Sequence, residues 1–494
     1  MISRVARLTV SLALLAASAA LGAPPTPAEA HLLGRLGYGH DNWTRNRLAT
    51  LGRAAYLDEQ LHPGQLPDPE LNGILATDPD LDAFRMTLPE IAATFRTTLP
   101  RRPGELLRQA RYEHLVRATV GRRQLQALLT EFWFNHFNVD LGGTDLHFLV
   151  PYLRDTLRPN ALGKFEDLLL AVAHSPAMLV YLDNARSFKA GFVQGGKTLG
   201  LNENYARELM ELHTFGMDDQ GPVYKQADVT EVARCLTGWT TDRVDGFRFL
   251  AAGHDQGTKR PLGLSIPANG GEQDGITVLR HLARHPRTAL FLSRKLVTFF
   301  VGPGQTALVD RARDRWIATQ GDLREVLRVI LGSSELVAAR DVKVKRPNLV
   351  FLTAMRSIDV DTSVQADRVR ALATVGNLCA EQGLPLYQVP PPTGWADAPG
   401  TFLSEGSMLE RFSALQRVFG GNNALVHGYD GNATSDAQLL TNLGDRILGT
   451  GGLTAQTRAG LAAYLAGLPA TTTRQERARL ITALIFSSPE FTTY

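Results

Sequence analysis

The stretch LLRQARYEHLVRATVGRRQLQALLTEFWFNHF, residues 106–137, decides the fold class. Core-type positions recur in it at intervals of three and four residues, which is the period of an α-helix, and Gly121 predicts a break between two helices. The side chains that follow this period are Leu107, Ala110, His114, Leu115, Leu125, Leu128, Leu129 and Phe132. The stretch therefore predicts two consecutive helices that each place one face against a core.

The same period recurs on both sides of this stretch. Residues 30–51 and 53–61 read as helices joined at Gly52, and several more helices are expected between residues 408 and 486. Alternating strand patterns are scarce, with Phe247–Leu250 and Ile266 as the candidates for a small ribbon. The expected fold class is mainly α: a large multi-helix globular fold with polar loops and at most a small β ribbon.

Composition excludes several classes of protein. The 494 residues are 44% hydrophobic and 20% charged with a net charge of +3, which is too apolar and too balanced for a disordered chain. The positive excess is too small for a nucleic-acid binder. Two cysteines cannot make a disulfide-rich scaffold or a four-thiolate zinc site.

The N-terminus predicts export. Residues 1–7 carry Arg4 and Arg7 without an acid, Leu8–Leu21 is apolar, and Gly22 and Ala23 supply small residues for cleavage. We expect residues 1–23 to be a signal peptide for the general secretory route, and the mature chain to be periplasmic or extracellular. The alternative is an uncleaved membrane anchor, although the apolar run is short for a span.

An oxidising compartment leaves two possibilities for Cys235 and Cys379, which either pair or stay as two buried thiols. The Gly/Asn/Asp-rich residues 420–435 predict a loop. We therefore divide the mature chain into a helical core over residues 31–418 and a C-terminal helical cap over residues 419–494.

Four polar sequence motifs, called words below, stand out in the middle of the chain. They are EFWFNHFN at 131–138, NENYARELMELH at 202–213, EVARCLTGW at 231–239 and HDQGTK at 254–259. Together with HLLGRLGYG at 31–39, they make the chain resemble the bacterial family called domain of unknown function 1800, over about residues 31–418. The resemblance implies an exported bacterial protein, often encoded beside a sulfatase-like protein that is a candidate partner. It brings no established reaction.

The helix predicted at 203–213 places Asn204, Glu208 and Glu211 on one face, with Arg207 within four residues of two acids. His213 falls on the opposite side. One interpretation is the wall of a cleft, with Glu208 or Glu211 as acid, base or metal ligand. The other is a solvated face with ion pairs along it, and His213 in the core.

The word at 131–138 does not have the spacing of a di-iron site. Glu131 and His136 lie about 140° apart on a helix, whereas bundle di-iron sites use Glu-x-x-His pairs. A packed, hydrogen-bonded His136 is the ordinary interpretation. His136 and His213 remain the candidate metal ligands, with a divalent metal as the candidate cofactor.

The loop at 254–259 can bring His254, Asp255 and Lys259 together as proton donor, base and anion clamp, because Gly257 permits a turn. An ordinary turn with exposed charges is the alternative. The chain has no motif for nucleotide or flavin binding, for a zincin, for a serine hydrolase or for a dithiol redox centre.

Lysine is rare in this chain. There are 8 Lys against 44 Arg, and all of the lysines lie between Lys164 and Lys345. Because Lys is a compact and titratable charge, we interpret Lys259, with Lys295 or Lys345, as kept for site chemistry. Chance clustering is the alternative.

Two functions follow from these residues, and the sequence leaves open which holds. The first is an exported enzyme acting on an envelope or extracellular substrate, small or polymeric, and not on nucleic acid. Its catalytic residues would be Glu208, Glu211, Glu231, His254 and Asp255, and its substrate-binding residues Asn204, Arg207, Arg234 and Lys259. The second is a non-catalytic helical scaffold or binding protein of the envelope, in which the polar words form structural ion-pair networks.

Overall fold

The computed structural model describes residues 23–98, 100–217, 223–242, 244–340, 342–397, 400–421 and 433–494. Nearly all of the predicted signal peptide and most of the predicted loop at 420–435 lie outside these ranges. Both stay predictions, as does the boundary at residue 419. No helix in the described ranges is long and apolar enough to cross a membrane.

The fold is mainly α, as predicted. The described residues are 64% helical and form 24 α-helices and two antiparallel two-stranded sheets. The chain divides into two compact units, and each is discontinuous in sequence. Unit 1 contains the described residues of 23–56, 337–383 and 400–494, and unit 2 those of 57–336 and 384–397.

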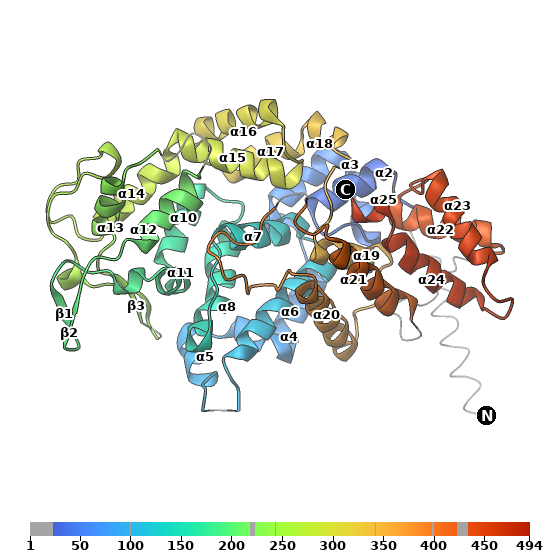
Figure 1. Cartoon of the computed structure of the whole chain (residues 1–494), viewed down its shortest axis with the longest axis horizontal. Coiled ribbons are helices and arrows are strands. Elements are labelled where there is room, and N and C mark those ends of the chain that lie inside the picture. Colours follow the sequence, from blue (N-terminus) through green and yellow to red (C-terminus); the bar gives the residue numbers. More distant parts are fainter. Residues whose placement is uncertain are drawn as a thin grey trace. The chain divides into compact units, whose positions relative to one another are not determined.

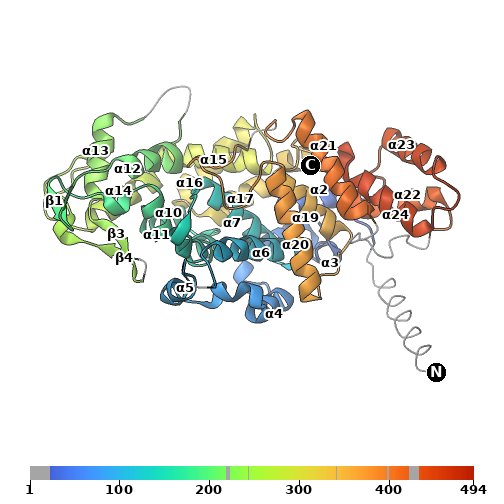
Figure 2. The same cartoon turned by 60° about the horizontal axis from the view of Figure 1, so that its bottom comes forward.

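Unit 2 contains most of the polar words. Its helices are α4 (Pro69–Thr77), α5 (Leu88–Thr94), α6 (Gly104–Val120), α7 (Gln124–His136), α8 (Leu149–Pro151), α9 (Arg158–Asn160), α10 (Phe165–His174), α11 (Pro176–Tyr181), α12 (Asn204–Glu208), α13 (Gln226–Cys235), α14 (Gln273–Arg284), α15 (Pro286–Phe300), α16 (Thr306–Thr319) and α17 (Leu323–Leu331). Helices α15, α16 and α17 lie side by side in both views (Figure 1, Figure 2).

Unit 1 is also helical. Its helices are α2 (Pro27–Leu36), α19 (Pro347–Ser357), α20 (Gln365–Glu381), α21 (Glu405–Leu415), α22 (Asp436–Leu448), α23 (Ala455–Ala466), α24 (Arg474–Phe486) and α25 (Pro489–Thr492). Helices α3 (Asn42–Leu61) and α18 (Ser334–Ala338) run across the sequence boundaries of the units. Helices α22, α23 and α24 pack together, and Figure 1 shows them in the red part of the chain.

The deciding stretch forms α6 and α7 with its break at Gly121, as predicted. A Cβ at Gly121 would lie 2.5 Å from the carbonyl oxygen of Arg117, so only glycine fits there. The helix expected over 30–51 is instead interrupted between α2 and α3. Gly39 has φ +91° in this interruption, and a Cβ there would lie 2.7 Å from Cγ2 of Thr353.

The β structure exceeds the predicted ribbon. Strands β3 (Trp239–Asp242) and β4 (Gly246–Phe249) pair around the predicted segment, but Ile266 pairs with Lys259 in an isolated bridge instead. A second hairpin joins β1 (Phe192–Gln194) to β2 (Lys197–Leu199). Neither Cys235 nor Cys379 forms a disulfide, and both thiols are buried. Burial raises the pKa of Cys235 to about 12, which keeps that thiol protonated.

Candidate functional site

Helix α12 and the π-helix that continues it, Leu209–Thr214, separate the polar and apolar faces as predicted. Leu209, Met210 and His213 are buried, whereas Glu208 and Glu211 are half-buried and Asn204 is exposed. Short π-helical segments within helices occur frequently at functional sites. The word at 202–213 therefore presents two carboxylates at the surface of an irregular helix.

Glu208 is the more perturbed of these carboxylates. Burial and the nearby charge of Glu211 raise its pKa above the ordinary range, and Arg207 opposes the change. Glu211 accepts a 2.6 Å hydrogen bond from the Tyr224 hydroxyl. Arg207 pairs with Glu203 at 3.6 Å and donates to Gln226, so it does not pair with Glu211 as the spacing allowed. The Asn204 amide donates to the carbonyl of Leu182.

Arg234 forms the centre of a separate network. Its guanidinium bonds both carboxylate oxygens of Asp255, at 2.8 and 3.1 Å, and one oxygen of Glu231 at 2.6 Å. The other Glu231 oxygen accepts from the backbone N–H of Arg260. Fork-like pairs of this kind are the strong, directional form of an ion pair. The predicted residues Glu231 and Asp255 thus both bind Arg234.

His254 and Lys259 both bind Asp274, a residue that lies outside the four polar motifs. Asp274 Oδ2, from α14, lies 2.7 Å from Lys259 Nζ and 3.1 Å from His254 Nε2. Lys259 Nζ also donates to the carbonyl oxygens of Asp255 and Gly257, at 2.5 and 3.0 Å. All three side chains, His254, Lys259 and Asp274, are buried, so the three ammonium protons are used inside the protein. Lys259 has no donor left for the predicted anion clamp.

The structure therefore divides the predicted site residues into two sets. Helices α12 and α13 are neighbours, linked by a hydrogen bond from Thr230 to Glu203. Within the ranges that the structure describes, no hydrogen bond or ion pair joins Glu208 or Glu211 to the network of Arg234. Glu208 and Glu211 are thus not part of the hydrogen-bonded network of Arg234, and a shared site stays a prediction.

A different pair comes together at the end of α7. Lys295 Nζ, from α15, lies 3.0 Å from His136 Nδ1, and His136 Nε2 lies 3.2 Å from the carbonyl oxygen of His213. This geometry has the imidazole donating from Nε2 and accepting at Nδ1, which is the neutral form. Burial, Lys295 and His213 accordingly lower the pKa of His136 well below its ordinary value. The motif at 131–138 thus binds Lys295 through His136, although the two residues lie far apart in sequence.

Lys295 is a half-buried amine with unused donors. Its hydrogen bond to His136 is the one it makes among the described residues. Burial lowers the pKa of Lys295 to about 8, and the charge of Asp397 limits that lowering. A lysine with such a pKa exchanges its proton near neutral pH, which is what a general base or a nucleophilic amine requires.

Asp397 belongs to a segment that unit 2 takes from the late part of the chain, residues 384–397, here called the return segment. Asn135 holds it with two hydrogen bonds to the backbone of Trp395, at 3.0 and 2.8 Å. Asn138 donates to the carbonyls of Val389 and Pro391. The word at 131–138 therefore fixes the return segment through its asparagines and Lys295 through its histidine.

The return segment also approaches the acidic face of α12. The Tyr181 hydroxyl donates to the carbonyl of Pro390 at 2.6 Å. Burial, Asp140 and Glu208 raise the pKa of Tyr181 to about 12, so Glu208 is close enough to act on it. The return segment thus contacts both candidate groups. Its Asp397 acts on the charge of Lys295, and its Pro390 binds Tyr181, which in turn lies close to Glu208.

The predicted metal ligands do not form a metal site with their described neighbours. No group of three or more His, Cys, Asp or Glu side chains in the described ranges is placed to hold a metal ion. His213 lies against Phe137 with ring centroids 5.0 Å apart, and neither of its ring nitrogens has a hydrogen-bond partner in the part of the chain described. Burial and Lys295 lower the pKa of His213 to about 3.

Sequence reasoning missed Asp274, Asp397 and Tyr181. None of the three lies in a polar word, and each meets its partners only through tertiary packing. Lys295 carried one usable signal, the scarcity of lysine, which singled it out together with Lys259 and Lys345.

Comparison with known protein families gives a match over nearly the whole chain. The family model described as "Protein of unknown function (DUF1800)" matches residues 31–493. This match runs past residue 418, where the sequence resemblance was drawn, and includes the C-terminal helices. No curated protein and no solved structure matches the chain. Because the family model covers nearly the whole chain, the protein belongs to the DUF1800 family.

Proposed function

We propose that this DUF1800 protein is an exported enzyme that performs acid–base chemistry on an envelope or extracellular substrate. The observation that carries the proposal is the Lys295 amine, 3.0 Å from a neutral His136 and half-buried beside the return segment. With a pKa of about 8, Lys295 is partly unprotonated near neutral pH and can accept a proton from substrate.

Glu208 is the proposed acid, with Glu211 beside it. Its raised pKa lets it keep a proton to a higher pH than an ordinary carboxyl group. Two titrating groups whose environments push them from opposite sides toward neutral pH are typical of acid–base pairs in enzymes. His136 is a positioning residue, because it holds the Lys295 amine through Nδ1.

The test uses substrates from the predicted compartment. The purified chain is incubated with isolated peptidoglycan, outer-membrane polysaccharide and secreted polymers, and released products are followed by mass spectrometry. We expect product from the wild-type chain, and at least a 100-fold lower rate for Lys295→Met and Glu208→Gln.

Matched controls are Lys197→Met and Glu70→Gln, which change an exposed lysine and an exposed glutamate of the same unit. These should keep the wild-type rate. Full activity in Lys295→Met, or no product from any fraction, would contradict the proposal.

A non-catalytic scaffold of the envelope is the second candidate function. This function is favoured by the hydrogen bonds of Arg234 and Lys259, whose N–H groups donate to acceptors inside the protein and not to a ligand. Cells lacking the protein separate the two candidates. A scaffold predicts that folded Lys295→Met restores any defect as well as the wild-type chain does, whereas the enzyme predicts that it fails.

A further inference from the structure

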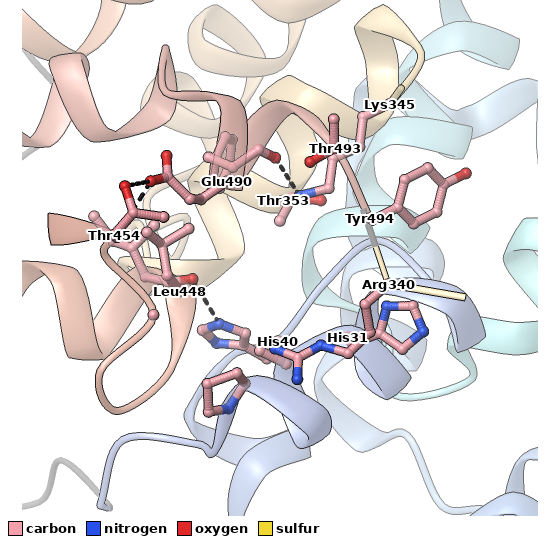
Figure 3. Close-up of a pocket in the computed structure, with 16 residues that line it drawn as sticks. His31, His40, Arg340, Lys345, Thr353, Leu448, Thr454, Glu490, Thr493 and Tyr494 are labelled. Atoms are coloured by element: carbon pink, nitrogen blue, oxygen red, sulfur yellow. Dashed lines mark hydrogen bonds between the residues drawn. The ribbon is translucent and has the colours of Figure 1, made fainter. Parts of the chain in front are cut away.

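Unit 1 contains a cavity of about 160 Å³ that the proposed acid–base site does not use. At about 30 Å³ for each water molecule of liquid, it has room for roughly five waters or a small organic molecule. Two sequence segments about 300 residues apart meet there, the word at 31–39 and the lysine before Arg346. Figure 3 shows the side chains that line it.

Helix α2 supplies one wall of this cavity through a single face. Pro27, Ala30, His31 and Gly34 all line it, and they follow the three- and four-residue helical spacing. A Cβ at Gly34 would meet no atom within 4 Å, so the glycine leaves open space in this wall. The other apolar walls come from Leu448 and the Phe491 ring, among others.

Two cations lie at the cavity. Lys345 is buried, donates to the carbonyl of Phe491 at 2.6 Å, and lies 4.3 Å from the centroid of that ring. Arg340 is exposed and has no hydrogen bond or ion pair among the described residues. Its guanidinium therefore offers donors that a planar anion can accept in pairs.

The acidic side chain of the lining, Glu490, is bound through one of its two oxygens, and the other, Oε2, is buried with no hydrogen-bond partner among the described residues. Glu490 Oε1 accepts from the Thr454 hydroxyl at 2.6 Å and from the Thr457 hydroxyl at 2.7 Å. Figure 3 shows Glu490 and Thr454 on one side of the cavity, and Arg340, His31 and Tyr494 on the other. The Arg340 side is thus the cationic side.

His40 adds no charge of its own. Its Nε2 lies 3.1 Å from the carbonyl of Ile447 and its Nδ1 3.4 Å from Arg45. Burial and the charge of Arg45 lower its pKa to about 3, so the ring is neutral.

We infer that this cavity binds a small organic carboxylate, with the carboxylate on Arg340 and the apolar body against α2, Leu448 and Phe491. An inorganic phosphate or sulfate would use the cation and leave the apolar walls unfilled. An apolar molecule of the same size would leave the Arg340 donors without a partner.

The experiment is isothermal titration of the purified full chain with butyrate, butyramide and inorganic phosphate. Butyrate and butyramide have the same size, and only butyrate is charged. We expect butyrate to bind at least tenfold more tightly than butyramide and than phosphate. Arg340→Gln should weaken butyrate at least tenfold and leave butyramide unchanged.

Gly34→Leu fills the cavity without a backbone conflict and should abolish butyrate binding. Its matched control is Gly460→Leu, because Gly460 is also a helical glycine of unit 1 with open space around its Cβ, outside the cavity. Thermal unfolding of both variants verifies that they fold. Butyrate binding that survives Gly34→Leu, equal binding of butyramide, or tighter binding of phosphate would each overturn the inference.

Discussion

Asp274 is a buried residue that binds two of the predicted site residues, His254 and Lys259. A single oxygen of its carboxylate lies within 3.1 Å of both His254 and Lys259. A buried charge that loses its partner keeps the cost of its lost hydration. The residues that look most catalytic in the loop at 254–259 are therefore held by a carboxylate twenty residues away in sequence.

Replacing Asp274 by Asn should destabilise the protein by about 3–5 kcal/mol, because the Lys259 ammonium then remains buried without a counter-charge. Urea unfolding of the two chains measures the change. Asp314→Asn is the control, since Asp314 is 66% exposed and its loss should cost no more than about 0.5 kcal/mol. A loss in Asp274→Asn as small as that in the control would contradict a structural role for the network.

His213 gives a pH-dependent prediction. Its pKa is about 3 in the folded protein, against an ordinary 6.5. Between these values the unfolded chain binds a proton that the folded chain does not, so stability is lost as pH falls below 6.5. Lowering the pH from 7 to 5 should cost about 2 kcal/mol through this residue.

The variant His213→Phe should remove that part of the acid sensitivity and leave stability at pH 7 nearly unchanged, since no hydrogen bond of the ring is lost among the described residues. Urea unfolding at pH 7 and pH 5 measures both values. Equal acid sensitivity in the two chains would show that the ring is not held neutral.

At the scale of elements, the return segment depends on α7. The Asn135 amide binds both backbone groups of Trp395, as a neighbouring strand would. Gly394 fits beside it with φ +69°, where a Cβ would lie 2.2 Å from the Asn135 side-chain oxygen. The return segment is thus held at Trp395 by hydrogen bonds from Asn135 to its backbone, and Gly394 leaves room for that side chain.

Asn135→Ala should raise the hydrogen-exchange rate of the Trp395 amide about tenfold, because a hydrogen bond of about 1–1.5 kcal/mol is lost. Mass spectrometry of the peptide covering residues 389–397 measures the change. Asn138→Ala is the matched variant: it removes hydrogen bonds to the carbonyls of Val389 and Pro391 and should leave the exchange of the Trp395 amide unchanged. Unchanged exchange at Trp395 in Asn135→Ala would show that other contacts hold the segment.

At the scale of the whole molecule, export is the prediction with the simplest test. If residues 1–23 are a signal peptide, the chain recovered from the periplasm or medium should begin after residue 22 or 23, or after the later small-residue site near Ala30. N-terminal sequencing and intact mass of the secreted chain measure this. A full-length chain retained in the membrane fraction would support the uncleaved anchor instead.

The sequence by itself determined the helical class, the break at Gly121 and the polar face of Glu208 and Glu211. Each depends on contacts within about four residues, which a local pattern records. The second hairpin and the break between α2 and α3 were missed, since Gly39 is explained only by its contact with Thr353.

Only the tertiary structure decided which polar residues meet. It bound Lys259 to Asp274, placed His136 against Lys295, and brought residues 384–397 into unit 2 after the chain had passed through unit 1. Contacts of this kind close loops of up to hundreds of residues. The geometry of these contacts depends on how the buried faces of distant elements pack. The spacing of residues within a motif does not predict that packing.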